Sequence, residues 1–351
     1  MGAAVEGIDV PAVTKWFVDN VPDTTPPVSF ELIAGGRSNL TYRVEDANGR
    51  QWALRRPPLS HVLSTAHDMG REHRVIRALG PTPVPVPETV GLCLDPTVND
   101  APFYVMEFVD GHILRDASGA AVALDEAARR HAGESLADTL AALHAVDVER
   151  VGLGDFAKHE DYIARQLHRW SRQFEDSEVS GPRAIDTATI VRAVHDRLAG
   201  DIPEQRGVAI VHGDYRLDNT ALGDDGSVRA VLDWELCTLG DPLADVGLLM
   251  VYWTEPGDEP SIVGVSPTVA PGFPGRAEMQ ARYEAASGRD LERLDFYVAF
   301  GYWKLACILQ GVYARYAGGA TAGDRTSVDG FATSVLRLAQ LAVERLDASS
   351  P

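Results

Sequence analysis

Two apolar runs, each ending in polar residues, constrain this chain more than any other feature. The first run, Val208–Val211, leads into a polar segment in which Asp214 is followed five positions later by Asn219. The second run, Val228–Leu232, leads into Asp233. We expect two hydrophobic strands with a polar loop between them, so that the polar groups meet at one strand end. In the phosphoryl-transfer template of kinases, one Asp accepts the proton of the attacking hydroxyl, while an Asn and a later Asp hold Mg²⁺.

Composition and charge exclude several classes of protein. The 351 residues are 45% hydrophobic, which is enough for two lobes, and the net charge of −19 counts against a nucleic-acid partner or an anionic membrane. The three cysteines are scattered, which indicates a reducing compartment and no metal cluster of thiolates. We find neither a signal peptide nor an apolar stretch that could cross a bilayer. We therefore expect a cytoplasmic protein, while the sequence does not indicate its oligomeric state.

Secondary-structure patterns divide the chain into two regions. Helix 10–18 precedes a region of strands at 29–34, 40–45, 51–55, 89–94 and 103–108, with one further helix at 66–79. Beyond residue 110 the pattern is helical at 124–146, 160–174, 187–198, 277–286, 291–316 and 330–346, interrupted only by the two apolar runs. We predict an α+β fold, with a small antiparallel-sheet lobe at 1–109 and a larger, mainly helical lobe at 110–351. The loop 254–275 is long enough to be mobile or to face a substrate.

The first region carries features that suit a nucleotide site, although each has a plainer interpretation. The turn between the first two strands contains Gly35, Gly36, Ser38 and Asn39. Small residues there would let backbone N–H groups approach phosphate oxygens, but a Gly pair between strands is also an ordinary turn. Alternation along the next strand places Ala53 and Arg55 on one face, where they would meet an adenine and its phosphates. Alternatively, Arg55 is a strand-end residue in solvent.

Two further features follow in the order that a nucleotide site requires. Glu72, on the predicted helix, would pair with Arg55, or would be an ordinary solvated Glu. Next to the lobe junction, Met106, Glu107 and Val109 are candidate contacts of an adenine, the last two through backbone groups. A buried strand leaving a core would look the same without a ligand. Each feature alone is ambiguous, but chance would rarely assemble the whole order.

This order of motifs resembles the aminoglycoside phosphotransferase (APH) and choline kinase-like superfamily. Within it, the chain is most similar to bacterial phosphotransferases related to the kinase-like domain that is fused to some acyl-CoA dehydrogenases. The resemblance covers about residues 28–340 and is carried by Gly35–Asn39, Leu54–Pro58, Val211–Asn219, Leu232–Glu235 and Gly240–Asp245. It implies a bilobal protein-kinase-like fold that binds ATP and Mg²⁺ between its lobes.

The resemblance also implies a role for each matching residue. Asp214 resembles the catalytic Asp, Asn219 and Asp233 resemble the Mg²⁺ ligands, and Glu72 resembles the ion-pair Glu. Arg55 stands where most kinases have Lys. Arg offers a planar fork and Lys a compact point charge, so phosphate binding should survive with a different geometry.

Three residues near the catalytic segment are expected to have either a supporting role or no role in catalysis. By the same resemblance, His212 supports the catalytic loop, and Asp245 ties that loop down by accepting backbone N–H bonds. Asp218 is interpreted as a solvated loop residue rather than an extra metal ligand.

We expect an ATP- and Mg²⁺-dependent phosphotransferase acting on a hydroxyl of a small molecule, either aminoglycoside-like or of hydroxyacyl type. The alternative is a nucleotide-binding pseudokinase without turnover. A protein kinase is disfavoured because no Ala-Pro-Glu segment follows Asp233. Aromatic residues at 251–253 and 296–303 are assigned mostly to core packing, and any that are exposed would favour a partly apolar acceptor.

Overall fold

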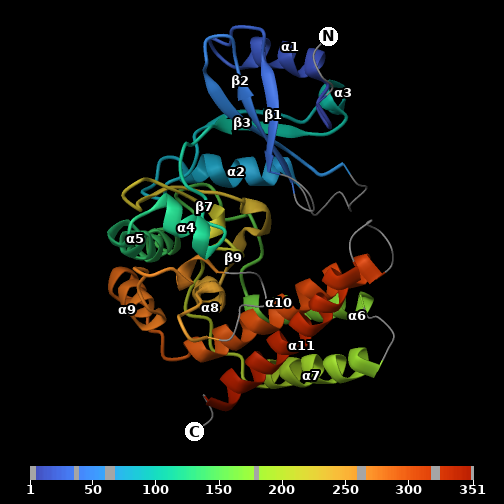
Figure 1. Cartoon of the computed structure of the whole chain (residues 1–351), viewed down its shortest axis with the longest axis vertical. Coiled ribbons are helices and arrows are strands. Elements are labelled where there is room, and N and C mark those ends of the chain that lie inside the picture. Colours follow the sequence, from blue (N-terminus) through green and yellow to red (C-terminus); the bar gives the residue numbers. More distant parts are fainter. Residues whose placement is uncertain are drawn as a thin grey trace.

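Two lobes of different composition make up the protein (Figure 1). The structure, a computed structural model, describes residues 5–34, 39–59, 68–177, 182–258, 266–317 and 325–348. The smaller lobe holds an antiparallel sheet in the order β1-β2-β3-β5-β4. Its strands are β1 (Ser29–Ala34), β2 (Leu40–Glu45), β3 (Gln51–Arg56), β4 (Thr89–Cys93) and β5 (Phe103–Glu107). Its helices are α1 (Val10–Asn20), α2 (Met69–Leu79) and α3 (Pro96–Asn99).

Side-chain alternation along β3 determines what covers each face of this sheet. Trp52 and Leu54 belong to a buried cluster with Phe17 of α1. Ala53 points the other way, into the core that contains Met69 of α2. The period-two pattern therefore places one helix on each face, as expected for a sheet that is buried on both sides.

Capping explains where α2 starts. The carboxylate of Asp68 accepts a hydrogen bond from the backbone N–H of Arg71 at 3.0 Å. An Asp at this position satisfies a free N–H group of the first turn, so the helix begins at Met69 rather than at residue 66. In the same way, Asp125 caps the helix that was expected from residue 124.

The larger lobe is mainly helical, as predicted. Its helices are α4 (Ala117–Ala123), α5 (Glu126–His144), α6 (Tyr162–Asp176), α7 (Pro182–Gly200), α8 (Leu243–Tyr252), α9 (Arg276–Ser287), α10 (Leu294–Ala317) and α11 (Arg325–Ala348). Its strands are β6 (Ala209–Val211), β7 (Thr220–Leu222), β8 (Val228–Val231) and β9 (Thr238–Gly240). Short 3₁₀ turns lie at Leu217–Asn219, Trp234–Leu236 and Pro267–Val269. No helix among these described residues is long and apolar enough to cross a membrane.

The two apolar runs form strands as expected, but the expectation that only two strands interrupt the helices was wrong in number. The first apolar run, β6, pairs with β9, and the second, β8, pairs with β7. The two apolar runs therefore belong to two separate ribbons. The additional strands are three residues each, too short to leave a readable alternation in the sequence.

Helix α8 was not predicted from the sequence. All its residues from Leu243 to Val251 are buried, including Asp245. A helix that is covered on every side has no polar face, so the amphipathic period that reveals other helices is missing.

The aromatic residues of α10 were interpreted correctly, since Phe296, Tyr297, Phe300 and Trp303 are buried in the core.

The connection between the lobes is tied to the larger lobe just after β5. His112 and Leu222 exchange backbone hydrogen bonds of 2.8 and 3.0 Å. A Cβ added to Gly111 would lie only 2.8 Å from the Leu222 carbonyl oxygen, so this approach requires glycine.

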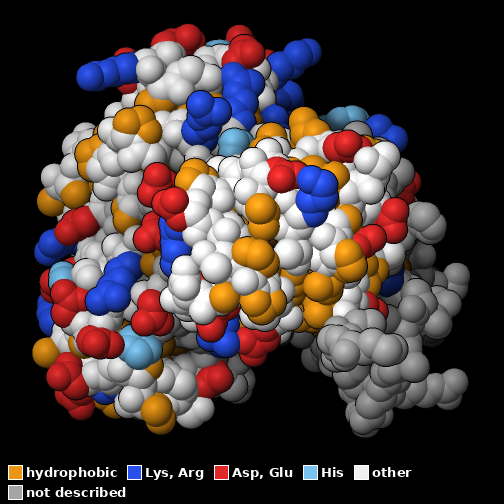
Figure 2. All heavy atoms as spheres, turned by 90° about the horizontal axis from the view of Figure 1, so that it is seen from above, with side chains coloured by type: hydrophobic (Ala, Val, Ile, Leu, Met, Phe, Trp, Pro, Cys, Tyr) orange, Lys and Arg blue, Asp and Glu red, His pale blue; other side chains and the backbone are white. Residues whose placement is uncertain are grey.

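Seen from the end that carries the sheet, acidic and basic side chains are interspersed (Figure 2). The net charge of −19 is therefore not concentrated on that face.

Candidate active site

Strand register brings the two halves of the catalytic motif together. Thr220 of β7 pairs with Val231 of β8, and the Leu232 N–H donates to the Asn219 carbonyl at 2.8 Å. The residues just before β7 and just after β8 therefore lie side by side. Asn219 and Asp233 reach the same end of this ribbon, as the sequence predicted, through the pairing of β8 with β7.

Asp214 lies at the centre of a small polar network and stays partly open to solvent, with 25% of its side chain exposed. Its Oδ2 accepts a hydrogen bond from Nδ2 of Asn219 at 2.9 Å. Its Oδ1 accepts one from the hydroxyl of Tyr252, at the end of α8, at 2.8 Å. Both carboxylate oxygens are thus oriented, while one side of the group remains accessible to a substrate.

Arg216 extends this network. Its guanidinium lies 3.5 Å from Asp214 and 3.5 Å from Asp218, and it sits 4.7 Å from the ring centroid of Tyr252. Asp218 is therefore a half-buried, ion-paired residue, and its interpretation as a solvated loop residue was wrong. Burial is the main cause that raises the pKa of Asp218.

The loop that carries Asp214 is fixed by buried groups on both sides. The Asp245 carboxylate accepts the backbone N–H groups of His212 at 2.6 Å and Gly213 at 2.8 Å, as the sequence resemblance implied. Nζ of Lys304, on α10, donates to the Gly213 carbonyl at 2.8 Å. The imidazole Nε2 of His212 lies 2.9 Å from the Leu232 carbonyl, which links the loop to the end of β8. His212 thus has a supporting position.

Burial acts on the charges of these supporting groups. Burial lowers the pKa of Lys304, while the charges of Asp214 and Asp245 oppose that shift. For Asp245, burial favours the neutral form, but contacts with His144 and the loop backbone outweigh it and lower the pKa. Buried carboxylates that accept several N–H bonds stay ionised, so Asp245 is a charged anchor for the loop.

Arg55 joins the sheet lobe to the catalytic segment. Its Nε lies 3.0 Å from Glu72 of α2, and its Nη2 contacts Asp233. Glu72 also accepts hydrogen bonds from Tyr104, at 3.0 Å, and from Asn39. The alternatives in which Arg55 and Glu72 are solvated are therefore wrong, because both side chains are buried.

The nucleotide-facing candidates of the sheet lobe are placed only in part. Ala53 and Met106 are directly paired across β3 and β5 and are buried. The Glu107 N–H already donates to the Glu88 carbonyl at 2.8 Å. Within the described part of the chain, the Val109 N–H makes no hydrogen bond. Gly35, Gly36 and Ser38 lie outside the described residues.

Excess negative charge collects around Asp233. Asp233 has a left-handed backbone with φ of +62°, rare for a residue with a side chain, and 26% of its side chain is exposed. Burial first, and then the charge of Asp233, raise the pKa of Glu235 to about 8. Carboxylate and carboxamide oxygens are the donors that divalent cations such as Mg²⁺ prefer. The carboxamide of Asn219 and the carboxylate of Asp233 therefore fit a Mg²⁺ ion.

Sequence reasoning missed four members of this site: Arg216, Glu235, Tyr252 and Lys304. Arg216 and Glu235 stand inside the quoted motifs and could have been weighed there. Tyr252 and Lys304 lie 38 and 91 positions from their partners in the loop, and no sequence pattern marks such a contact.

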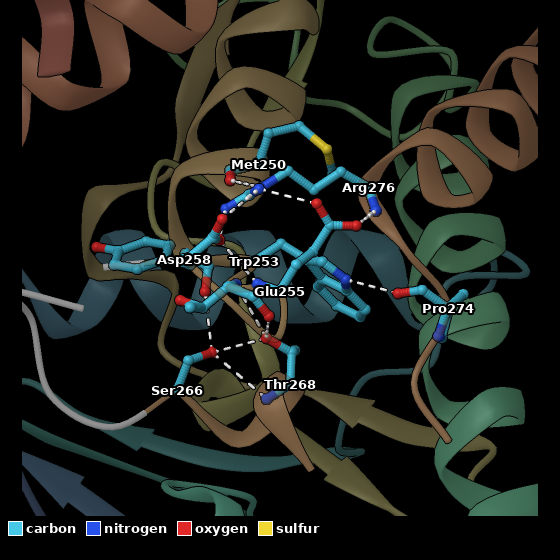
Figure 3. Close-up of polar contacts among 10 residues, drawn as sticks. Met250, Trp253, Glu255, Asp258, Ser266, Thr268, Pro274 and Arg276 are labelled. Carbon is cyan, nitrogen blue, oxygen red and sulfur yellow. Dashed lines mark hydrogen bonds and ion pairs between the residues drawn. The ribbon is translucent and has the colours of Figure 1, made fainter. Parts of the chain in front are cut away.

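The long loop 254–275 has anchored ends. Figure 3 shows Arg276 facing Glu255 and Asp258, and the indole of Trp253 donating to the Pro274 carbonyl. The Arg276–Glu255 ion pair is 3.0 Å long and the Trp253 bond is 2.9 Å long. Within the loop, the Ser266 hydroxyl donates to the Tyr252 carbonyl at 3.1 Å. The anchors therefore support the residue that holds Asp214, while residues 259–265 lie outside the description.

Comparisons with known proteins agree with this geometry. The profile of the phosphotransferase enzyme family matches residues 29–297. The mouse protein acyl-CoA dehydrogenase family member 10 is 35% identical over 296 residues, which cover 83% of this chain and 27% of that protein. This chain thus corresponds to about a quarter of that relative.

Two solved structures have the same fold. A provisionally named aminoglycoside phosphotransferase from Ralstonia eutropha is 31% identical, with a TM-score of 0.80 over 98% of this chain and 99% of that one. A thermostable mutant of another aminoglycoside phosphotransferase, in complex with AMP-PNP and hygromycin B, is 15% identical, with a TM-score of 0.60 over 93% and 98% of the two chains. Together, the comparisons support a kinase of small molecules. The chain belongs to the phosphotransferase enzyme family.

Proposed function

We propose that this protein transfers the γ-phosphoryl group of ATP, with Mg²⁺, to a hydroxyl of a small molecule. The observation that carries the proposal is the convergence of Asp214, Asn219 and Asp233 on one accessible spot, next to Arg55. A base, two oxygen donors for a metal and a cation are the parts that phosphoryl transfer needs.

The nucleotide would lie between the lobes. Arg55 is held by Glu72, so its charge is available at a defined place for phosphate oxygens. Gly35, Gly36, Ser38 and Asn39 would approach the phosphates. Ala53 and Met106 would cover the adenine, and the Glu107 carbonyl and the Val109 N–H would bond its edge. AMP-PNP in the ternary complex of the related fold supports ATP as the donor.

The chemical step assigned to this chain is the acceptance of a proton. Asp214 would orient the acceptor hydroxyl and take its proton while the acceptor oxygen bonds to the γ-phosphorus. The bond between the γ-phosphorus and the bridging oxygen breaks, and ADP leaves with that electron pair. Asn219 and Asp233 would hold Mg²⁺, which supplies positive charge next to the phosphates. Positioning and charge neutralisation then provide most of the acceleration.

For the acceptor, we favour the hydroxyacyl type over the aminoglycoside type. A polycationic aminoglycoside needs unpaired carboxylates, whereas the carboxylates of Asp214 and Asp218 both face the cation of Arg216. Similarity to a member of the acyl-CoA dehydrogenase family supports the same choice.

The boundary between the two lobes is proposed to lie between residues 109 and 110. This position is close to the backbone contact between His112 and Leu222.

A screen of acceptors with γ-labelled ATP tests this function. The panel comprises aminoglycosides, hydroxyacyl-CoA compounds, sugars and amino alcohols, each with and without MgCl₂. Magnesium-dependent labelling of a hydroxyacyl compound is the expected result. Binding of Mg-nucleotide by calorimetry, with no labelling of any acceptor, would instead support the pseudokinase alternative. Absence of nucleotide binding at about millimolar concentration would reject both.

A further inference from the structure

A cavity lies against α2, away from the catalytic segment. Its volume is about 930 Å³. It is bounded by α2, by the connector that follows it, by Leu92 of β4 and by the segment 145–152 after α5. Its lining is in part apolar, with Leu92, Val146 and Val151, and in part cationic. A cavity of this size accommodates a small molecule.

Four basic side chains line this cavity: His73, Arg74, Arg77 and Arg150. Arg74 is engaged, because it contacts Asp155 and donates to the Gly152 carbonyl at 2.8 Å. The guanidinium groups of Arg77 and Arg150 make no hydrogen bond or ion pair within the described ranges. Two unpaired guanidinium groups at one cavity provide a charge that an anion can neutralise.

The remaining charged groups of the cavity do not cancel this excess. Asp147 is the acidic residue of the lining, and its Oδ1 already accepts the backbone N–H groups of Glu149 and Arg150 at 3.0 and 3.1 Å. Burial, and then the charge of Arg77, lower the pKa of His73. In a chain with a net charge of −19, a cavity with this sign is unexpected on composition alone.

We propose that this cavity binds a small molecule that combines a phosphomonoester with a short apolar chain. The phosphate dianion would bind Arg77 and Arg150, since guanidinium groups recognise phosphate through paired N–H donors. The apolar part would contact Leu92, Val146 and Val151. This ligand differs from the nucleotide. The nucleotide would lie on the opposite side of α2.

The position of the cavity gives the ligand a route to the catalytic segment. Glu72, the neighbour of His73 in α2, is buried and holds Arg55. A ligand that braces α2 from outside would therefore stabilise the Glu72–Arg55 pair and lower the KM for ATP. This effect rests on the proposed function, whereas the binding site itself does not.

Titration calorimetry of the whole chain with hexyl phosphate tests the site. Wild type should bind hexyl phosphate, and the double variant Arg77→Gln/Arg150→Gln should bind it at least about tenfold more weakly. The matched control is Lys15→Gln/Arg172→Gln, which also removes two positive charges, but from exposed positions on α1 and α6. The control should bind like wild type. Equal weakening in both double variants, or no binding by wild type at about 10 mM, overturns the proposal.

A competition experiment separates this site from the nucleotide site. Hexyl phosphate should bind more tightly when the protein is saturated with Mg-AMP-PNP, because two ligands that favour the same arrangement of α2 strengthen each other's binding. Displacement by the nucleotide would contradict a separate cavity. Hexanol, which lacks the phosphate, should bind at least about tenfold more weakly, and equal binding would show that the arginines contribute nothing. These measurements need no turnover, so a failure of the proposed kinase activity would leave their outcome unaffected.

Discussion

The hydroxyl of Tyr252 donates a hydrogen bond to Oδ1 of Asp214 at 2.8 Å, and so fixes the carboxylate proposed to be the base. Replacing Tyr252 by Phe removes this bond and leaves the ring in place. We expect kcat to fall about tenfold, which corresponds to about 1.4 kcal/mol, a usual loss for one bond to a charged group. Affinity for Mg-ATP should not change, because Tyr252 would not touch the nucleotide. Steady-state kinetics with nucleotide binding by calorimetry measures both quantities.

Tyr302→Phe is the matched control for this variant. Tyr302 is a half-buried tyrosine of α10 that does not bond Asp214. Its loss should leave kcat within about twofold of wild type. A Tyr252→Phe enzyme with wild-type kcat would show that the hydrogen bond does not position the base.

Arg55 links Glu72 to Asp233, and its removal should expose the cost of a buried charge. Arg55→Met leaves Glu72 buried without its cation, so we expect a loss of about 3 to 5 kcal/mol of unfolding free energy. Arg55→Lys keeps the charge but not the fork, and should lose less stability while raising the KM for ATP about tenfold. Denaturant unfolding and kinetics measure the two effects. Equal stability of the Met and Lys variants would refute the importance of the Glu72 pair.

Lys304 holds the carbonyl that precedes the proposed base. Lys304→Met is similar in length and suits the buried position, but it leaves the Gly213 carbonyl without its donor. We expect a loss of about 1 to 3 kcal/mol of stability and a fall in kcat that exceeds any change in KM. Lys15→Met, at an exposed position of α1, serves as the control. Wild-type kcat and stability in the Lys304 variant would mean that the bond is dispensable.

The stability of the fold should fall in mild acid because of His144. Burial lowers its pKa below the ordinary 6.5, although Asp245 opposes the shift. The unfolded chain therefore takes up the proton first, so the contribution of His144 is complete above about pH 6.5 and is lost as the pH falls toward the folded-state pKa. Arg289, Asp241 and Tyr283 also surround this ring, and burial raises the pKa of Asp241.

Denaturant unfolding at several pH values between about 5 and 7.5 tests this expectation. His144→Gln keeps polar atoms at the site but cannot titrate, so its stability should vary less with pH than that of wild type. His73 has a lowered pKa as well and titrates in both proteins, which is why the difference between the two curves is the relevant quantity. Identical slopes would exclude His144 as the cause.

The parts of the site that could be predicted are those whose signal is local. Asp214 and Asp233 follow short apolar segments and Asn219 precedes one. The β7–β8 register brings Asn219 and Asp233 together, and a hydrogen bond joins Asn219 to Asp214. The Arg55–Glu72 pair was one of two interpretations of these residues, and the resemblance to kinases was the reason to consider it. Their roles in binding and catalysis remain proposals.

The parts that could not be predicted depend on long-range packing. Helix α8 is buried on every side, so no amphipathic pattern reveals it. Because Tyr252 ends this helix, its position beside Asp214 could not be predicted either. Lys304 looks like any surface cation until α10 is placed beneath the catalytic loop. The pairing of β6 with β9 needs the position of α8 as well, because Asp245 fixes the loop that follows β6.

The central claim, that Asp214 is the base of a phosphotransferase, is tested most directly by Asp214→Asn. The amide keeps the size of the side chain but cannot accept the proton. We predict Mg-ATP binding within about threefold of wild type and a loss of turnover of at least about 10³-fold, measured by calorimetry and by transfer of labelled γ-phosphate to the best acceptor of the screen. Turnover close to that of wild type in the Asp214→Asn protein would contradict the account.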